Sequence, residues 1–188
     1  MGRWEPNARG RLEQAAMELY GERGYEQTTV TEIAKRAGLS ERTFFRHYAD
    51  KREVLFGGSA ALQDLLVAGL GDAPASAPAI DVVAAALDAV AASFDGRREF
   101  ALRRQGIISA NAELRERELI KLASLSAALA GALRARGVAE PAASLAAEAG
   151  IAVFKVAFER WIDGDGSRSM GHFTHEALVA LRAVTAGA

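Results

Sequence analysis

The sequence has no cysteine among its 188 residues. This absence excludes disulfides, zinc sites built on thiolates and catalysis by a thiol, and it fits a reducing compartment. Long apolar runs are also missing, because no stretch reaches the ~18 apolar residues of a membrane-spanning helix. The first residues, MGRWEPNARGRLEQ, carry charges where a signal peptide needs an apolar core. We therefore expect a cytoplasmic protein with no membrane partner.

Sequence motifs of catalysis are lacking too. The chain has no glycine-rich phosphate loop, no context for a nucleophilic serine and no His-Glu-x-x-His motif. Of its few histidines, His172 and His175 are close in sequence, but no third metal ligand is evident near them. The sequence predicts neither an enzyme nor a protein with a cofactor or a metal site.

The residues that are present predict an all-α protein. Half of the chain is apolar, which is enough for a core, and no segment alternates apolar and polar residues as a strand would. A first helix over residues 6–23 has one continuous apolar face and Pro6 at its start. We expect about nine helices, divided between an N-terminal head, residues 1–52, and a larger helical body, residues 53–188.

Residues 29–53, TVTEIAKRAGLSERTFFRHYADKRE, decide what the head does. Thr29 and Glu32 have the spacing of a capping box, so a second helix should begin there and stop at Gly38. Ser40 is the expected N-cap of a third helix, whose first amides then point outward with partial positive charge. Two short helices joined by a turn that contains glycine are the layout of a helix-turn-helix DNA reader.

The outer surface of the third helix has the chemistry of a major-groove reader. Phe44 and Tyr48 lie one turn apart and should face the core. Arginine can donate two hydrogen bonds to guanine, and threonine or an exposed phenylalanine can touch a thymine methyl group. The side chains expected on the outside are those of Glu41, Arg42, Thr43, Phe45, Arg46 and His47.

Positive charge is concentrated in the same segment, although the whole chain has a net charge of only −1. Residues 35–52 hold six lysine or arginine residues against two acidic ones, a local balance of +4. Asp50 should cap a fourth helix with Lys51 in its first turn, where a cation costs ~0.3 to 1 kcal/mol. A phosphate contact explains this lysine better than helix stability does, and a solvated surface lysine is the alternative.

The segment from about residue 7 to residue 56 resembles the N-terminal head of the TetR family of bacterial transcriptional regulators. The residues that carry the resemblance are Gly24-Tyr25, Thr28-Thr29-Val30, Ile33-Ala34, Ala37-Gly38-Leu39-Ser40, Thr43-Phe44-Phe45-Arg46-His47-Tyr48 and Lys51. The resemblance implies that homodimers bind near-palindromic operators in double-stranded DNA and that a small molecule binds in the body.

The resemblance also assigns roles to residues of the head by their position. It implies that Thr29, Thr31 and Lys51 contact phosphates and that the outer residues of the third helix read bases. Phe45 stands where the family often has tyrosine, so the phosphate hydrogen bond of that phenol is lost here. The expected DNA-binding residues are Thr29, Thr31, Ser40, Arg42, Thr43, Phe45, Arg46, His47 and Lys51.

The body should contain five helices after a loop over residues 71–79. They are expected at about residues 80–95, 97–110, 112–136, 141–163 and 169–186. The last two are apolar on more than one side, so each needs cover on more than one side. A second copy of the chain would supply this cover through a homodimer built on these two helices, and burial within one subunit is the alternative.

A ligand cavity is expected among the middle helices, on the strength of the family resemblance. Its candidate lining is Phe94, Arg104, Ile108, Asn111, Phe154 and Phe158. Ordinary core packing is the alternative for each apolar residue. Arg97, Arg98, Arg103 and Arg104 could hold an anionic ligand or pair with surface carboxylates.

These features predict a DNA-binding transcriptional regulator, a repressor that leaves its palindromic operator when a small-molecule effector binds. Release follows if the effector binds the DNA-incompetent state more tightly. The alternative is a helical adaptor or ligand-binding protein with a degenerate DNA-binding head. Gly57 and Gly58 lie in the expected fourth helix, which joins the head to the body, and each costs about 1 kcal/mol there relative to alanine. We expect a bend or hinge at this pair that transmits ligand occupancy to the head, and close packing against a neighbouring helix is the alternative.

Overall fold

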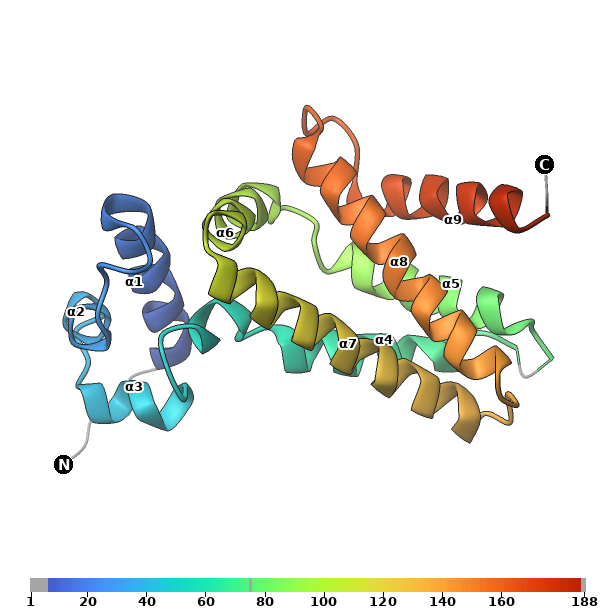
Figure 1. The fold of residues 1–188 in the computed structure, drawn as a ribbon, viewed down its shortest axis with the longest axis horizontal. Helices are drawn as coiled ribbons and strands as arrows, with labels where there is room; N and C mark the ends of the chain where they lie inside the picture. Colours follow the sequence, from blue (N-terminus) through green and yellow to red (C-terminus); the bar gives the residue numbers. More distant parts are fainter. Residues whose placement is uncertain (1–6, 75, 187–188) are drawn as a thin grey trace. The chain divides into compact units, whose positions relative to one another are not determined.

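The computed structural model describes residues 7–74 and 76–186, and these residues form α- and 3-10 helices without a strand (Figure 1). This agrees with the all-α prediction. The three helices of the head are α1 (Ala8–Arg23), α2 (Val30–Arg36) and α3 (Glu41–His47). The later elements are η1 (Glu53–Phe56), α4 (Ser59–Gly69), η2 (Leu70–Asp72), α5 (Ala79–Ala92), α6 (Arg98–Ala110), α7 (Ala112–Ala135), α8 (Ala142–Asp163) and α9 (Met170–Ala186).

Two boundaries differ from the sequence-based expectation. Helix α1 begins at Ala8 because the Asn7 side chain accepts a hydrogen bond from the Gly10 amide and caps the helix, whereas Pro6 lies outside the described residues. The expected fourth helix is not continuous. The Asp50 carboxylate accepts hydrogen bonds from the Arg52 and Glu53 amides, but the N-cap is Arg52 and not Asp50 as expected. The helix is a 3-10 turn that ends before Gly57 and Gly58, and α4 begins only at Ser59.

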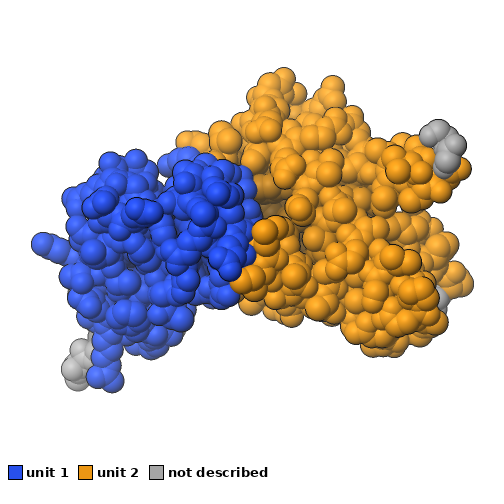
Figure 2. Space-filling model, viewed as in Figure 1, with its two compact units in different colours: residues 1–58, 103–118 blue, residues 59–102, 119–188 orange. Residues whose placement is uncertain are grey.

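The chain forms two compact units, coloured separately in Figure 2. The first unit contains residues 1–58 and 103–118, and the second contains residues 59–102 and 119–188. The first unit is therefore larger than the head expected from the sequence, because the end of α6 and the start of α7 belong to it. The division into domains at residue 52 rests on the sequence pattern alone.

The core of the first unit explains why residues 103–118 belong to it. Leu12, Ile33 and Phe44 come from α1, α2 and α3, and all three side chains are fully buried. Ile108 from α6 and Leu114 from α7 are fully buried in the same cluster. Each such side chain contributes roughly 1.5–3 kcal/mol by leaving water.

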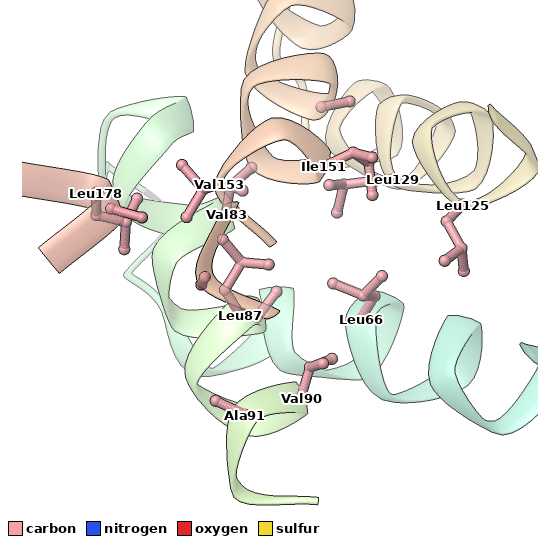
Figure 3. Close-up of a cluster of buried hydrophobic side chains, with 14 of the residues drawn as sticks. Leu66, Val83, Leu87, Val90, Ala91, Leu125, Leu129, Ile151, Val153 and Leu178 are labelled. Carbon is pink, nitrogen blue, oxygen red and sulfur yellow. The ribbon is translucent and has the colours of Figure 1, made fainter. Parts of the chain in front are cut away.

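The second unit is organised around α5. Val83, Leu87 and Val90 are buried on this helix and meet apolar side chains from α4, α7, α8 and α9 (Figure 3). Gly150 on α8 allows close approach, because a Cβ atom there would lie 2.5 Å from Val83 Cγ1. Arg98 closes the end of α8 by donating hydrogen bonds to the carbonyl oxygens of its last turn.

The segment Glu53–Asp72 has the length and apolar composition of a membrane-spanning helix, by those two criteria alone. In the structure the segment is interrupted at Gly57 and Gly58, and Leu66 and Leu70 are buried in the core of the second unit. Core packing thus accounts for part of its apolar side chains, whereas Leu65 and Val67 are exposed.

Candidate nucleic-acid interface

The start of α2 is fixed by the capping box that the sequence predicts. The Thr29 hydroxyl accepts a hydrogen bond from the Glu32 amide, and Glu32 Oε2 accepts one from the Thr29 amide at 2.9 Å. This backbone hydrogen bond is the main reason why the pKa of Glu32 is lowered. The Glu32 carboxylate therefore stabilises Thr29 in its position as the N-cap of the helix.

Helix α3 begins at the predicted cap, Ser40. Its hydroxyl accepts from the Thr43 amide at 3.2 Å and lies 3.0 Å from the Thr43 hydroxyl. Phe44 is fully buried, and Tyr48 is buried with its hydroxyl donating to Glu13 Oε1 of α1 at 2.7 Å. These two aromatic anchors fix which side of α3 faces outward, as the sequence predicts.

The outward side of α3 is exposed and mostly basic. The Phe45 side chain is 54% exposed although it is apolar, and Arg42, Arg46 and His47 are exposed beside it on the same short helix. Of the other predicted DNA contacts, Thr29, Thr31 and Ser40 are exposed, whereas Thr43 is half-buried. The structure thus brings the predicted base-reading residues together on one helix.

The environment of Lys51 differs from the one expected for a lysine side chain that is free to contact a DNA phosphate. Its ammonium nitrogen donates to the carbonyl oxygens of Tyr25, Glu26 and Thr28 at 2.9, 3.1 and 3.0 Å. The nitrogen also lies 4.4 Å from the centroid of the Tyr25 ring, close enough for a cation–π contact. An ammonium group has three donors. All three are used to hold the segment that leads into Thr29.

We expect Lys51→Met to lower the free energy of unfolding by about 2 kcal/mol, because charged hydrogen bonds to the three carbonyl oxygens are lost. Chemical denaturation of the full chain measures this change. Lys35→Met is the control, since Lys35 is exposed on α2 and its replacement should change stability little. Unchanged stability in Lys51→Met, together with weakened DNA binding, would favour the phosphate contact over the structural role.

Part of the positive charge of the segment is neutralised within the protein. Arg36 pairs with Glu22 at 2.9 Å and with Glu18 at 3.3 Å, and its hydrogen bond lowers the pKa of Glu22. Arg52 pairs with Asp50 at 2.6 Å and with Glu113 at 2.7 Å. Most of these pairs could not be predicted from the sequence, because Glu18, Glu22 and Glu113 come from other helices.

Three of the candidate ligand residues lie together in the second unit. Phe94, in the turn after α5, is 6.0 Å from Phe154 and 5.7 Å from Phe158, measured between ring centroids. Trp161 joins them at 5.6 Å from Phe94. Sequence reasoning did not include Trp161 in the ligand set, although it lies about one turn after Phe158.

The other three candidate ligand residues belong to the first unit. Arg104 Nε donates to the Leu55 carbonyl oxygen at 2.7 Å, and burial lowers the pKa of this guanidinium group. The side chain of Ile108 is 0% exposed in the core, and Asn111 Nδ2 donates to the Ile107 carbonyl oxygen. The six candidates therefore do not form one group, and a ligand role for any of them stays a prediction.

A family model described as bacterial regulatory proteins, tetR family, matches residues 13–56, which include α2, the turn and α3. The HTH-type transcriptional regulator TcmR of Streptomyces glaucescens is 38% identical over 82 residues, covering 44% of this chain and 36% of TcmR. The HTH-type transcriptional activator FasR of Mycolicibacterium smegmatis is 37% identical over 65 residues, covering 35% of this chain and 30% of FasR. These alignments span about a third of each relative's length.

The structural similarity extends over nearly the whole chain. The crystal structure of Thermus thermophilus FadR, a TetR-family transcriptional repressor in complex with lauroyl-CoA, has a TM-score of 0.55 and 25% sequence identity. The match covers 92% of this chain and 92% of FadR. Residues 13–56 thus match the helix-turn-helix domain of the TetR family, and the all-helical fold of the described residues is that of TetR-family regulators.

Proposed function

We propose that this chain is a cytoplasmic transcriptional repressor that binds a palindromic operator as a homodimer and is released by a small-molecule effector. The observation that carries the proposal is the outer side of α3, where the apolar ring of Phe45 is exposed together with Arg42 and Arg46. A 54% exposed phenylalanine is costly in water, and a thymine methyl group or a sugar face would cover it in a DNA complex.

The exposed side of the last two helices supports a homodimer. Four large apolar side chains on α8 and α9 are exposed in the single chain, namely Leu145, Val156, Val179 and Val184. A two-fold dimer that covers them would carry two DNA-reading heads for half-sites spaced about 34 Å apart, or a multiple of that distance. Such a dimer would read both halves of a palindromic operator.

The aromatic cluster of the second unit supports an apolar effector. Phe94, Phe154 and Phe158 are only partly buried, so part of each side chain is still exposed and could contact an apolar ligand. T. thermophilus FadR was crystallised with lauroyl-CoA, whose acyl chain is apolar. We therefore propose an acyl thioester or another molecule with a long apolar chain as the effector class.

Selection of random duplex oligonucleotides at about 150 mM salt tests the proposal. We expect the wild type to enrich an inverted repeat and an Arg46→Ala/Thr43→Ala variant to enrich none. The Thr43 amide that Ser40 caps remains in this variant, so α3 should still form. If the wild type also enriches no sequence, operator binding is wrong and the adaptor alternative is favoured.

A further inference from the structure

Glu41 is the one acidic residue on α3, and it is exposed at the start of that helix. Other carboxylates of the first unit are engaged by cations, as Glu22 is by Arg36 and Asp50 is by Arg52. The Glu41 carboxylate forms no ion pair within residues 7–74 and 76–186, although Arg42 is its neighbour in sequence. Its hydrogen-bond partner in this part of the chain is the Thr31 hydroxyl of α2, at 2.8 Å.

The hydrogen bond from Thr31 to Glu41 changes what Thr31 can do. A carboxylate only accepts hydrogen bonds, so the Thr31 hydroxyl must be the donor. A hydroxyl has one proton, and a phosphate oxygen also needs a donor. Thr31 therefore cannot hold Glu41 and donate to a phosphate at the same time. Its position favours the first role, because it joins α2 to the start of the reading helix.

A carboxylate on a DNA-facing helix is repelled by phosphates, so it needs a donor on the DNA to compensate. In the major groove the donors are the amino groups of cytosine and adenine. Adenine presents its amino group beside the N7 acceptor, and a carboxylate gives N7 no donor. The cytosine amino group is therefore the partner that suits an ionised carboxylate.

We propose that Glu41 is a specificity-determining residue, which accepts a hydrogen bond from a cytosine amino group in each operator half-site. Thr31 acts as a positioning residue that holds the carboxylate from the neighbouring helix. The inference rests on the proposed operator binding and adds one feature to it: each half-site contains a cytosine that α3 reads through an acidic side chain.

Duplex selection with the full-length wild type, Glu41→Gln and Thr31→Val tests this proposal. We expect one cytosine position in the wild-type half-site, and replacing its C·G pair by T·A should weaken wild-type binding by about 5- to 150-fold. Glutamine both donates and accepts, so Glu41→Gln should lose the cytosine preference or change it to adenine while the other positions persist.

Thr31→Val separates positioning from phosphate contact. If Thr31 positions Glu41, the valine variant loses discrimination at the cytosine position and keeps most of its affinity for the T·A duplex. If Thr31 holds a phosphate, affinity falls by the same factor on both duplexes, and the positioning role is wrong. Thermal melting of each variant checks that the fold is retained.

The outcomes distinguish this inference from the proposed function. A wild type that enriches no sequence overturns operator binding, and the reading role of Glu41 falls with it. A wild type that enriches an operator, together with a Glu41→Gln variant that selects the same half-site with the same cytosine preference, overturns the Glu41 proposal alone.

Discussion

Replacing Ile108 with alanine is expected to lower the free energy of unfolding of the first unit by about 2–5 kcal/mol. Ile108 lies in α6, far in sequence from the helix-turn-helix, but its side chain is 0% exposed in the cluster that contains Phe44. Removing its methyl and methylene groups leaves a cavity in the buried cluster that also contains residues of the head helices α1, α2 and α3. Their amides should then exchange faster, because local opening becomes easier.

The matched control is Ile120→Ala, which makes the same chemical change in α7. The Ile120 side chain is 48% exposed, so its removal should cost less than about 0.5 kcal/mol. Hydrogen–deuterium exchange of peptides from α1, α2 and α3 in the full chain measures the effect directly. If exchange in these helices is the same in Ile108→Ala as in the wild type, residues 103–118 do not stabilise the reading helices.

The helix caps were predictable from the sequence because each depends on residues a few positions apart. Thr29 and Glu32 cap α2, and Ser40 caps α3, as their spacing indicated. The positions of the five body helices were also confirmed to within three residues at each end. Helical periodicity and loop-forming residues are local signals, and local signals are sufficient for these features.

Contacts between distant segments could not be predicted in the same way. Ile108 is one of several apolar residues in α6, and nothing near it in sequence indicates that it joins the buried cluster of the first unit. The three carbonyl acceptors of Lys51 are more than 20 residues away, and carbonyl groups have no sequence signature. The basic side chains that have no acidic partner in the protein could therefore be identified only from the tertiary contacts.

The salt dependence of DNA binding should reflect only the cations that have no acidic partner in the protein. Among the described residues of α2 and α3, these are Lys35, Arg42 and Arg46, whereas Arg36 is paired with Glu18 and Glu22. A homodimer would present six such cations. Raising salt from about 50 to about 200 mM should then weaken operator binding by roughly 10³-fold.

The adjacent pair Lys35 and Arg36 provides a sharp test of this count. Lys35→Ala removes one free cation from each head, so the slope of log affinity against log salt should become shallower by about two units per dimer. Arg36→Ala removes a cation that already has two carboxylate partners, so the slope should stay the same. The surface pairs of Arg36 are worth at most about 1 kcal/mol, so this variant should remain folded.

Fluorescence anisotropy of the selected operator at several salt concentrations gives both slopes. If all six basic residues of the segment 35–52 contacted phosphates in each head, the loss of affinity would be on the order of 10⁶-fold. A loss near that value, or an Arg36→Ala slope as shallow as that of Lys35→Ala, would mean that DNA displaces the internal carboxylates. A loss near 10³-fold with an unchanged Arg36→Ala slope would mean that the ion pairs seen in the free protein persist on DNA.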